Sequence, residues 1–97
     1  RETFCSPELG FASDYSGTLL RLEVVPGTTA RLVDVGVRDA SRLTADLYPG
    51  MPSVYSGWGS TQAFFKKEGQ VVNVGLGYGR ALDMFERSIA NVEVIPR

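Results

Sequence analysis

Residues Val71–Ile95, VVNVG-LGYG-RALDMFERSIA-NVEVI, carry the most consistent structural signals in the chain. Apolar residues at every second position of Val71–Leu76 predict a strand, because side chains alternate between the two faces of a sheet. Three glycines then predict a loop, and the apolar stripe that follows Arg80 has the spacing of a helix. The period of two returns at Val92 and Val94. The whole stretch therefore reads as strand, glycine loop, helix and strand.

The glycine loop could hold a phosphate. Gly75, Gly77 and Gly79 can leave backbone N–H groups open, and the start of the next helix attracts anions. Arg80 would add a positive charge, and Tyr78 could stack on a ligand ring. The spacing matches neither the dinucleotide fingerprint nor the P-loop, so a tight turn in which two backbones approach closely remains the alternative.

The composition is that of one small globular domain covering residues 1–97. The chain has 43% hydrophobic and 22% charged residues, a net charge of −1 and a pI near 5.3. The chain therefore lacks the excess of positive charge that is typical of proteins that bind duplex DNA or an anionic membrane. No apolar run approaches the ~20 residues that span a bilayer. Because the first residue is Arg1 and not methionine, we expect a domain cut from a longer protein or a processed product.

The rest of the chain alternates short strand and helix patterns. Pro26-Gly27 predicts a turn between two strands that pair as a hairpin, and Glu68-Gly69 predicts a second hairpin. The other expected elements are a helix from Ser6 to Gly17, strands at Leu19–Val25 and Arg31–Val37, a helix capped by Asp39 with a stripe of Ala40, Leu43 and Leu47, and a strand at Gln62–Lys67. The predicted fold is α+β, with a mixed, mostly antiparallel sheet of about five strands and two or three short helices.

A long loop separates the second expected helix from the strand at Gln62. It runs from Tyr48 to Thr61 and is rich in proline, glycine, aromatic and hydroxyl residues. Loops of this kind often carry function. The structural alternative is that Trp58 simply caps the edge of the core.

Missing residue types limit the chemistry. The chain has no histidine and one cysteine, Cys5, so it cannot build a histidine-based nucleophile pair, an internal disulfide or a plausible zinc site. What remains are phosphate-binding cations, stacking aromatics and neutral hydrogen-bonding groups: Lys66, Lys67 and Arg80; Tyr55, Trp58 and Tyr78; Ser60, Thr61 and Gln62. This set favours binding and orienting a nucleotide.

Four short segments of the chain resemble patterns of known toxins. Phe4-Cys5-Ser6-Pro7, Ala12–Tyr15 and Leu20–Thr28 resemble in order a pattern of ADP-ribosyltransferase-like toxins. Gly57–Phe64, GWGSTQAF, looks like the glycine-rich segment of the tuberculosis necrotizing toxin family of NAD glycohydrolases, in which Gln62 would match the catalytic glutamine. The chain also resembles C-terminal toxin domains of bacterial polymorphic and contact-dependent inhibition systems.

The resemblance implies a secreted or delivered effector that acts in the cytoplasm of a target cell and is paired with a cognate immunity protein. NAD would be its substrate, and no cofactor would be bound permanently. Gln62, Thr61 and Arg80 would be catalytic, while Trp58 and the glycine loop with Tyr78 would bind the nucleotide. No Glu-X-Glu or Gln-X-Glu motif is present, so the resemblance does not extend to the glutamate of protein-modifying transferases.

Two alternatives to NAD chemistry stay open. The expected short helices and antiparallel sheet also resemble small ribonuclease toxins of these systems. Some of those enzymes work without histidine, and here the corresponding residues would be Thr61, Lys66, Arg80 and Tyr78. The acidic balance of the chain opposes that hypothesis, because RNA binding depends on phosphate neutralisation. The other alternative is a non-enzymatic interaction module that uses the Tyr48–Trp58 loop as its contact surface.

Overall fold

The structure, a computed structural model, describes residues 3–5, 19–54 and 57–96. Its elements are β1 (Thr3–Cys5), β2 (Leu19–Val24), α2 (Thr28–Asp34), β3 (Gly36–Arg38), α3 (Arg42–Leu47), the 3₁₀ turn η1 (Trp58–Ser60), β4 (Ala63–Glu68), β5 (Val71–Leu76), α4 (Arg80–Arg87) and β6 (Ile89–Ile95). The predicted α+β class with mostly antiparallel strands is confirmed. The helix expected from Ser6 to Gly17 lies outside the described residues.

The larger sheet has the strand order β1-β5-β4-β3. As predicted, β4 and β5 form an antiparallel hairpin, in register from Ala63↔Leu76 to Glu68↔Val71. Gly69 closes it with a φ of 65°, a conformation that glycine adopts readily. β3 lies parallel to β4 at the other edge, so the sheet is mixed.

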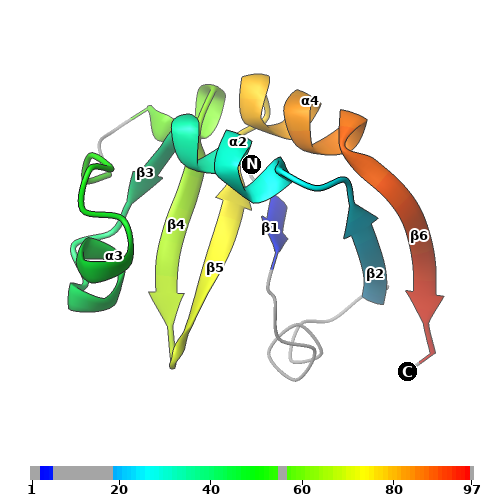
Figure 1. Cartoon of the computed structure of the whole chain (residues 1–97), viewed down its shortest axis with the longest axis horizontal. Coiled ribbons are helices and arrows are strands. Elements are labelled where there is room, and N and C mark those ends of the chain that lie inside the picture. The colour runs from blue at the N-terminus through cyan, green and yellow to red at the C-terminus, as the bar shows by residue number, and fades with distance from the viewer. Residues whose placement is uncertain (1–2, 6–18, 55–56, 97) are drawn as a thin grey trace.

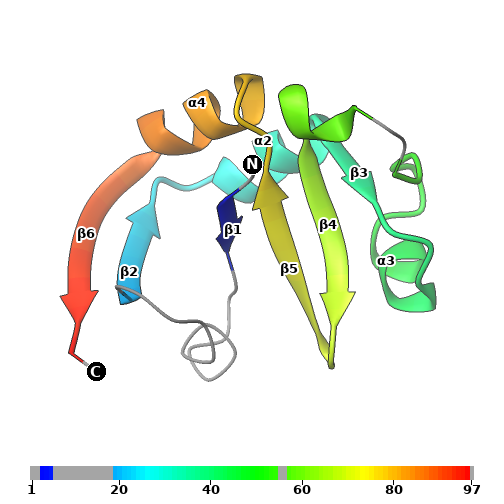
Figure 2. The ribbon, with the colours of Figure 1, turned by 180° about the vertical axis from the view of Figure 1, so that it is seen from behind.

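α2 lies against one face of this sheet, and α4 lies across the upper ends of its strands (Figures 1 and 2). Phe65 of β4 and Leu76 of β5 are 2% and 1% exposed on that face. The buried core cluster comes from α2, the loop before η1, the sheet and α4: Leu32, Met51, Ala63, Phe65, Leu76 and Ala81. Burying a side chain such as Phe65 or Leu76 stabilises the fold by about 1.5–3 kcal/mol. This cluster is therefore the main source of stability among the described residues.

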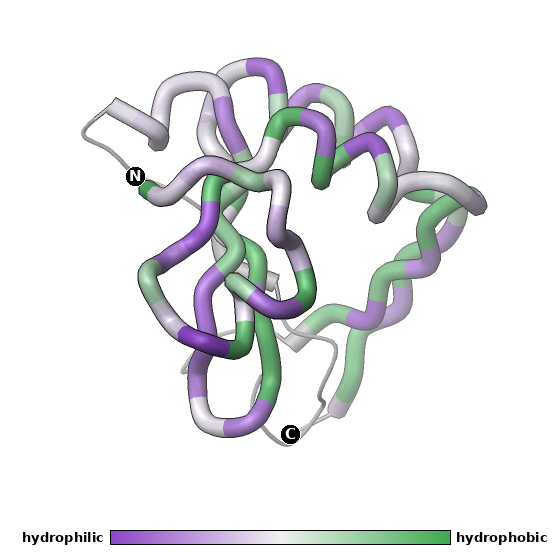
Figure 3. The backbone as a smooth tube through the Cα atoms, turned by 60° about the vertical axis from the view of Figure 1, so that its left-hand side comes forward, coloured by the Kyte–Doolittle hydropathy of each residue, from purple (hydrophilic) through white to green (hydrophobic). Residues whose placement is uncertain are grey.

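β2 and β6 form a second, two-stranded sheet, which we call the ribbon. It stands beside the larger sheet in Figures 1 and 2. Leu20 pairs with Val94 and Leu22 with Val92, so their side chains share one face. Figure 3 shows the resulting alternation of apolar and polar residues along both strands. β6 follows α4 as predicted, but it does not return to the sheet that contains β5.

The predicted hairpin between Leu19–Val25 and Arg31–Val37 is wrong. Thr28–Asp34 is a helix, and only Gly36–Arg38 is a strand. Gly27 begins the helix with a φ of 88°, and the Thr28 hydroxyl donates to the Val25 carbonyl at 2.6 Å. Leu32 is then buried in the core. Tertiary burial at Leu32 thus overrides the strand preference of the nearby valines.

The details predicted for α3 are also wrong. Ser41, not Asp39, is the N-cap, and its hydroxyl accepts from the Thr44 amide. Thr44 is fully buried, whereas Ala40 and Leu47 of the expected apolar stripe are exposed. A network of polar bonds around Asp39 holds this short helix, so apolar spacing was the wrong guide.

Candidate functional site

The glycine loop between β5 and α4 packs directly on the segment that holds η1. The Gly77 amide donates to the Gln62 carbonyl at 2.8 Å, and the Tyr78 amide donates to the Gly59 carbonyl at 3.0 Å. The Ala81 amide donates to the Thr61 carbonyl at 3.2 Å. These three N–H groups are therefore already used by the protein and are not open to a phosphate.

The glycines are required by this close approach. A Cβ at Gly77 would lie 2.6 Å from the Gln62 carbonyl oxygen, and a Cβ at Gly79 would collide with the Ser60 carbonyl oxygen. Gly75 is buried within β5, opposite Phe64. None of the three has a positive φ. The structure thus favours the tight-turn alternative for the loop over the phosphate cradle.

The same packing brings Gln62 and Arg80 to one cavity. It has a volume of about 560 Å³ and lies among the end of α2, the Tyr48–Pro52 loop, Gln62 and the first residue of α4. Pockets that bind small molecules have volumes of this order. Two of the three predicted catalytic residues therefore share a cavity, although they are 18 positions apart in the sequence.

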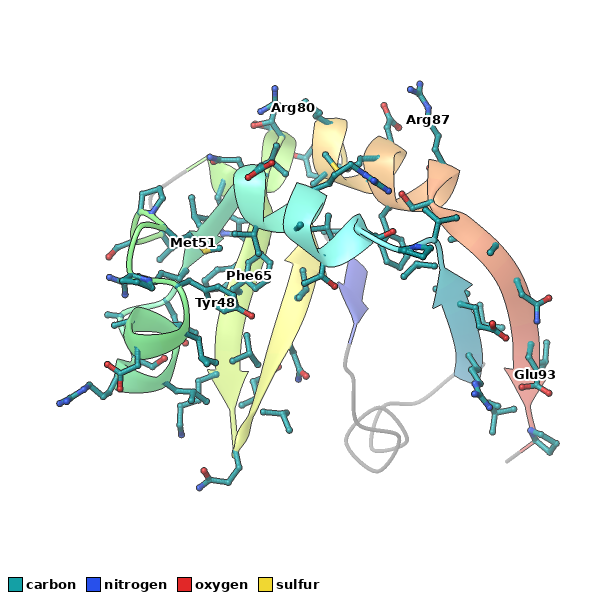
Figure 4. All side chains as sticks on the ribbon, viewed as in Figure 1. Tyr48, Met51, Phe65, Arg80, Arg87 and Glu93 are labelled. Carbon is teal, nitrogen blue, oxygen red and sulfur yellow. The ribbon has the colours of Figure 1, made fainter. Side chains whose placement is uncertain are left out.

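The lining of this cavity is chemically varied. Asp34 supplies a carboxylate, Arg80 a guanidinium and Gln62 an amide. Neither Asp34 nor Arg80 forms an ion pair with another described residue. The Tyr48 ring also lines the cavity and packs on Phe65, with ring centroids 5.0 Å apart (Figure 4). The cavity thus offers one negative group, one positive group, one neutral group and an aromatic wall.

The Tyr48–Pro52 part of the long loop is anchored to the core. Met51 is 6% exposed, and its carbonyl oxygen accepts from Arg38 Nε at 3.1 Å. Tyr48 is half-buried. This part of the loop forms a wall of the cavity, while Pro49, Gly50 and the residues from Pro52 to Val54 remain exposed.

The other predicted site residues do not line the cavity. Thr61 and Tyr78 are exposed, and Tyr78 reaches 58%. Trp58 packs on Phe64, with ring centroids 4.8 Å apart. Because Phe64 alternates with Phe65 along β4, Trp58 lies toward the sheet face opposite the core. Trp58 therefore packs against the sheet through Phe64 and does not line the cavity.

That opposite face carries a polar cluster of its own. Lys66 Nζ lies 3.8 Å from Glu68 Oε2, and Asn73 Nδ2 donates to Glu68 Oε1 at 2.9 Å. Asn73 is 2% exposed, and its Oδ1 is buried without a hydrogen-bond partner among the described residues. Lys66 and Arg80 consequently belong to different faces, and the predicted ribonuclease residues do not form one site.

Sequence reasoning missed Asp34 because its segment was assigned to a strand. The useful signal was Pro26-Gly27 followed by Thr28, a turn that leads into helix-forming residues. Within the described ranges, no group of three or more Cys, Asp or Glu side chains could hold a metal ion. Nor does any helix there have the length and apolar character to cross a membrane.

Comparison with known families identifies the chain at the family level. Residues 1–94 match the PT3 toxin domain. The chain belongs to the PT3 toxin domain family. The predictions of a toxin and of a polymorphic toxin domain are thereby confirmed. A PT3 toxin domain also fits a delivered effector with a cognate immunity protein. No curated protein matches the chain, and the family match names no substrate.

Proposed function

We propose that this PT3 toxin domain cleaves the nicotinamide–ribose bond of NAD in the cytoplasm of the target cell. The observation that carries the proposal is the shared cavity of Gln62 and Arg80, with Asp34 and Tyr48 beside them. A cognate immunity protein would protect the producing cell. Transfer of ADP-ribose to another acceptor is the related outcome if water is excluded.

Cleavage of this bond needs little general acid–base catalysis. The C–N glycosidic bond breaks, its electron pair leaves with nicotinamide, and positive charge develops on the ribose. Water then attacks the ribose carbon and releases a proton, which gives ADP-ribose. The Asp34 carboxylate would stabilise the developing positive charge, an electrostatic contribution that is often the largest one in catalysis. No histidine is needed for any of these steps.

The remaining cavity residues would hold the substrate. The Gln62 amide can donate to and accept from ribose hydroxyls or the nicotinamide carboxamide. The Tyr48 ring offers an apolar surface to the nicotinamide, and Arg80 can contact a phosphate through two N–H groups. Such orientation contributes to the rate because the reacting bond is held in one geometry.

Nicotinamide release from purified protein tests the proposal. Asp34→Asn should lower kcat by about 100- to 1,000-fold, and Gln62→Ala should lower turnover by about 100-fold. Asp46→Asn and Gln70→Ala are the matched controls, because both residues are exposed and neither lines the cavity. If the Asp34→Asn and Gln62→Ala variants both release nicotinamide at the wild-type rate, the proposed site is refuted.

Cleavage of RNA is the second candidate, supported by the Lys66–Glu68–Asn73 cluster. A carboxylate next to an ammonium group can accept a 2′-hydroxyl proton while the cation neutralises phosphate. With tRNA as the substrate, Glu68→Gln and Lys66→Ala should abolish cleavage while Asp34→Asn leaves it intact. Inactivity of the wild-type protein on both NAD and tRNA would favour the interaction module.

A further inference from the structure

A second hollow lies between α2 and α4, next to the proposed NAD cavity. It has a volume of about 640 Å³, and its lining includes three arginines, Arg31, Arg80 and Arg87, with one carboxylate, Asp83. Arg80 and Arg87 are the first and last residues of α4, seven positions apart. Two helical turns separate them by about 10 Å on one side of the helix. Figure 4 shows both side chains extending from the same side of the molecule.

The three guanidinium groups have no carboxylate partner within the described part of the chain. None forms an ion pair with a described residue, although Asp83 lines the same hollow. Arg31 Nη2 instead contacts the Ser88 hydroxyl at 3.2 Å and the Thr28 hydroxyl at 3.4 Å, which holds this side chain between the two helices. Three cations against one anion give the hollow an excess of positive charge, and planar guanidinium groups suit phosphate oxygens.

Arg80 lines both the first cavity and this hollow. One residue therefore stands at the boundary of two neighbouring sites. The hollow also has apolar lining from Val25, which is 40% exposed, and from Met84. An aliphatic side chain and a flexible thioether can together contact the face of a purine ring.

We propose that the α2–α4 hollow binds the adenosine diphosphate half of the dinucleotide. Arg80 and Arg87 contact the two phosphates, Arg31 is the third cation, and adenine lies beside Val25 and Met84. This inference rests on the proposed function, because the nicotinamide half would occupy the first cavity. Arg80 would then hold the pyrophosphate between the two halves.

Calorimetric binding of ADP tests this site without any turnover, since ADP has no nicotinamide bond. Arg87→Met should weaken ADP binding about tenfold, as expected for loss of a charge-assisted hydrogen bond. Nicotinamide mononucleotide should bind equally well to wild type and to Arg87→Met, because it lacks the adenosine half. Arg42→Met is the control, since Arg42 forms an exposed salt bridge with Asp46 on α3 and does not line the hollow.

Further variants separate phosphate binding from adenosine binding and from misfolding. Met84→Ala should weaken ADP but leave inorganic pyrophosphate unchanged. Arg31→Lys retains the charge and should retain most of the ADP affinity and the circular dichroism spectrum. ADP affinity that is unaffected by Arg87→Met, undetectable in wild type, or equal to that of pyrophosphate would overturn the inference. The assay is independent of NAD cleavage, so an inactive protein that still binds ADP here would refute only the proposed function.

Discussion

The helix-covered sheet and the ribbon have similar alternating sequences but opposite environments. Phe65 and Leu76 in the sheet are 2% and 1% exposed, whereas Val92 and Val94 in the ribbon are 51% and 64% exposed. α2 and α4 both contribute to the core of the sheet, and among the described residues nothing comparable covers the ribbon. A period of two predicts a strand, but the packing of other elements decides whether that strand contributes to the core.

The largest expected difference between the two regions comes from truncating an apolar side chain in each. Phe65→Ala should lower the free energy of unfolding by about 3–5 kcal/mol, because it leaves a cavity in the core. Val94→Ala should lower the free energy of unfolding by less than about 1 kcal/mol, since the Val94 side chain is already mostly exposed to water. Urea unfolding followed by circular dichroism measures both. Equal losses would mean that the ribbon is as well packed as the sheet.

A smaller effect is expected where the sheet meets the candidate site. Gly79→Ala should destabilise the protein by about 1–3 kcal/mol, because its Cβ would collide with the Ser60 carbonyl oxygen and the two loops must separate. Gly59→Ala is the control, because a Cβ there meets no atom within 4 Å. If both variants unfold at the same urea concentration, the close approach of the two loops is not needed for stability.

Acid should weaken the edge of the sheet at Asp39. Partial burial raises the pKa of this carboxyl, but hydrogen bonds from Ser41, Thr44 and the Lys67 amide outweigh burial and lower it from 3.8 to about 2. Because the pKa of Asp39 is lower in the folded protein than in the unfolded chain, its ionised carboxylate contributes its full stabilisation above about pH 4. This contribution is lost as the pH falls from about 4 to 2. The free energy of unfolding should fall by about 1–2 kcal/mol over this range, after allowance for solvent screening.

Asp39→Asn isolates this contribution from other carboxylates. Its unfolding free energy should lie below that of wild type at pH 6, and the gap should narrow toward pH 2. Asp46→Asn is a suitable comparison, since its salt bridge with Arg42 is exposed. A gap between Asp39→Asn and wild type that stays constant from pH 6 to pH 2 would contradict the assignment.

The smallest effect is expected for a polar substitution in the ribbon. Val92→Thr should change the free energy of unfolding by no more than about 0.5 kcal/mol, because threonine suits a solvated strand. Native-state hydrogen exchange sharpens the comparison: amides of β6 should exchange sooner than amides of β4. Slower exchange in β6 would show that the ribbon is the more stable region.

Local patterns predicted the parts of the fold that depend on neighbours in sequence. The hairpin from Ala63 to Leu76 and the helix at Arg80–Arg87 follow from alternation, a glycine turn and a helical stripe. The pairing of β2 with β6 could not be predicted in this way, because it depends on contacts between distant segments. For the same reason, α2 could not be predicted from its local sequence, because the helix depends on burial of Leu32 in the core.

The candidate site was predicted in part. The resemblance to NAD glycohydrolase toxins points to Gln62 and the charge of Arg80 points to phosphate binding, and the structure places both residues at one cavity. Asp34 and Tyr48 join them through tertiary packing that local spacing cannot reveal. Trp58 and the glycines were selected as ligand-binding residues, yet their observed contacts are with the protein itself. Aromatic and glycine residues serve packing as readily as binding, so residue type alone could not separate the two roles.

The pairing of β2 with β6 also has a consequence for the order in which the chain folds. The β4–β5 hairpin joins segments separated by a two-residue turn, whereas Leu19 pairs with Ile95 across most of the sequence. Loop closure over such a distance is slow and costs entropy. During synthesis, β2 has no partner until the ribosome has made β6. We therefore expect the sheet that carries the candidate site to form first, and the ribbon to close only after β6 has left the ribosome.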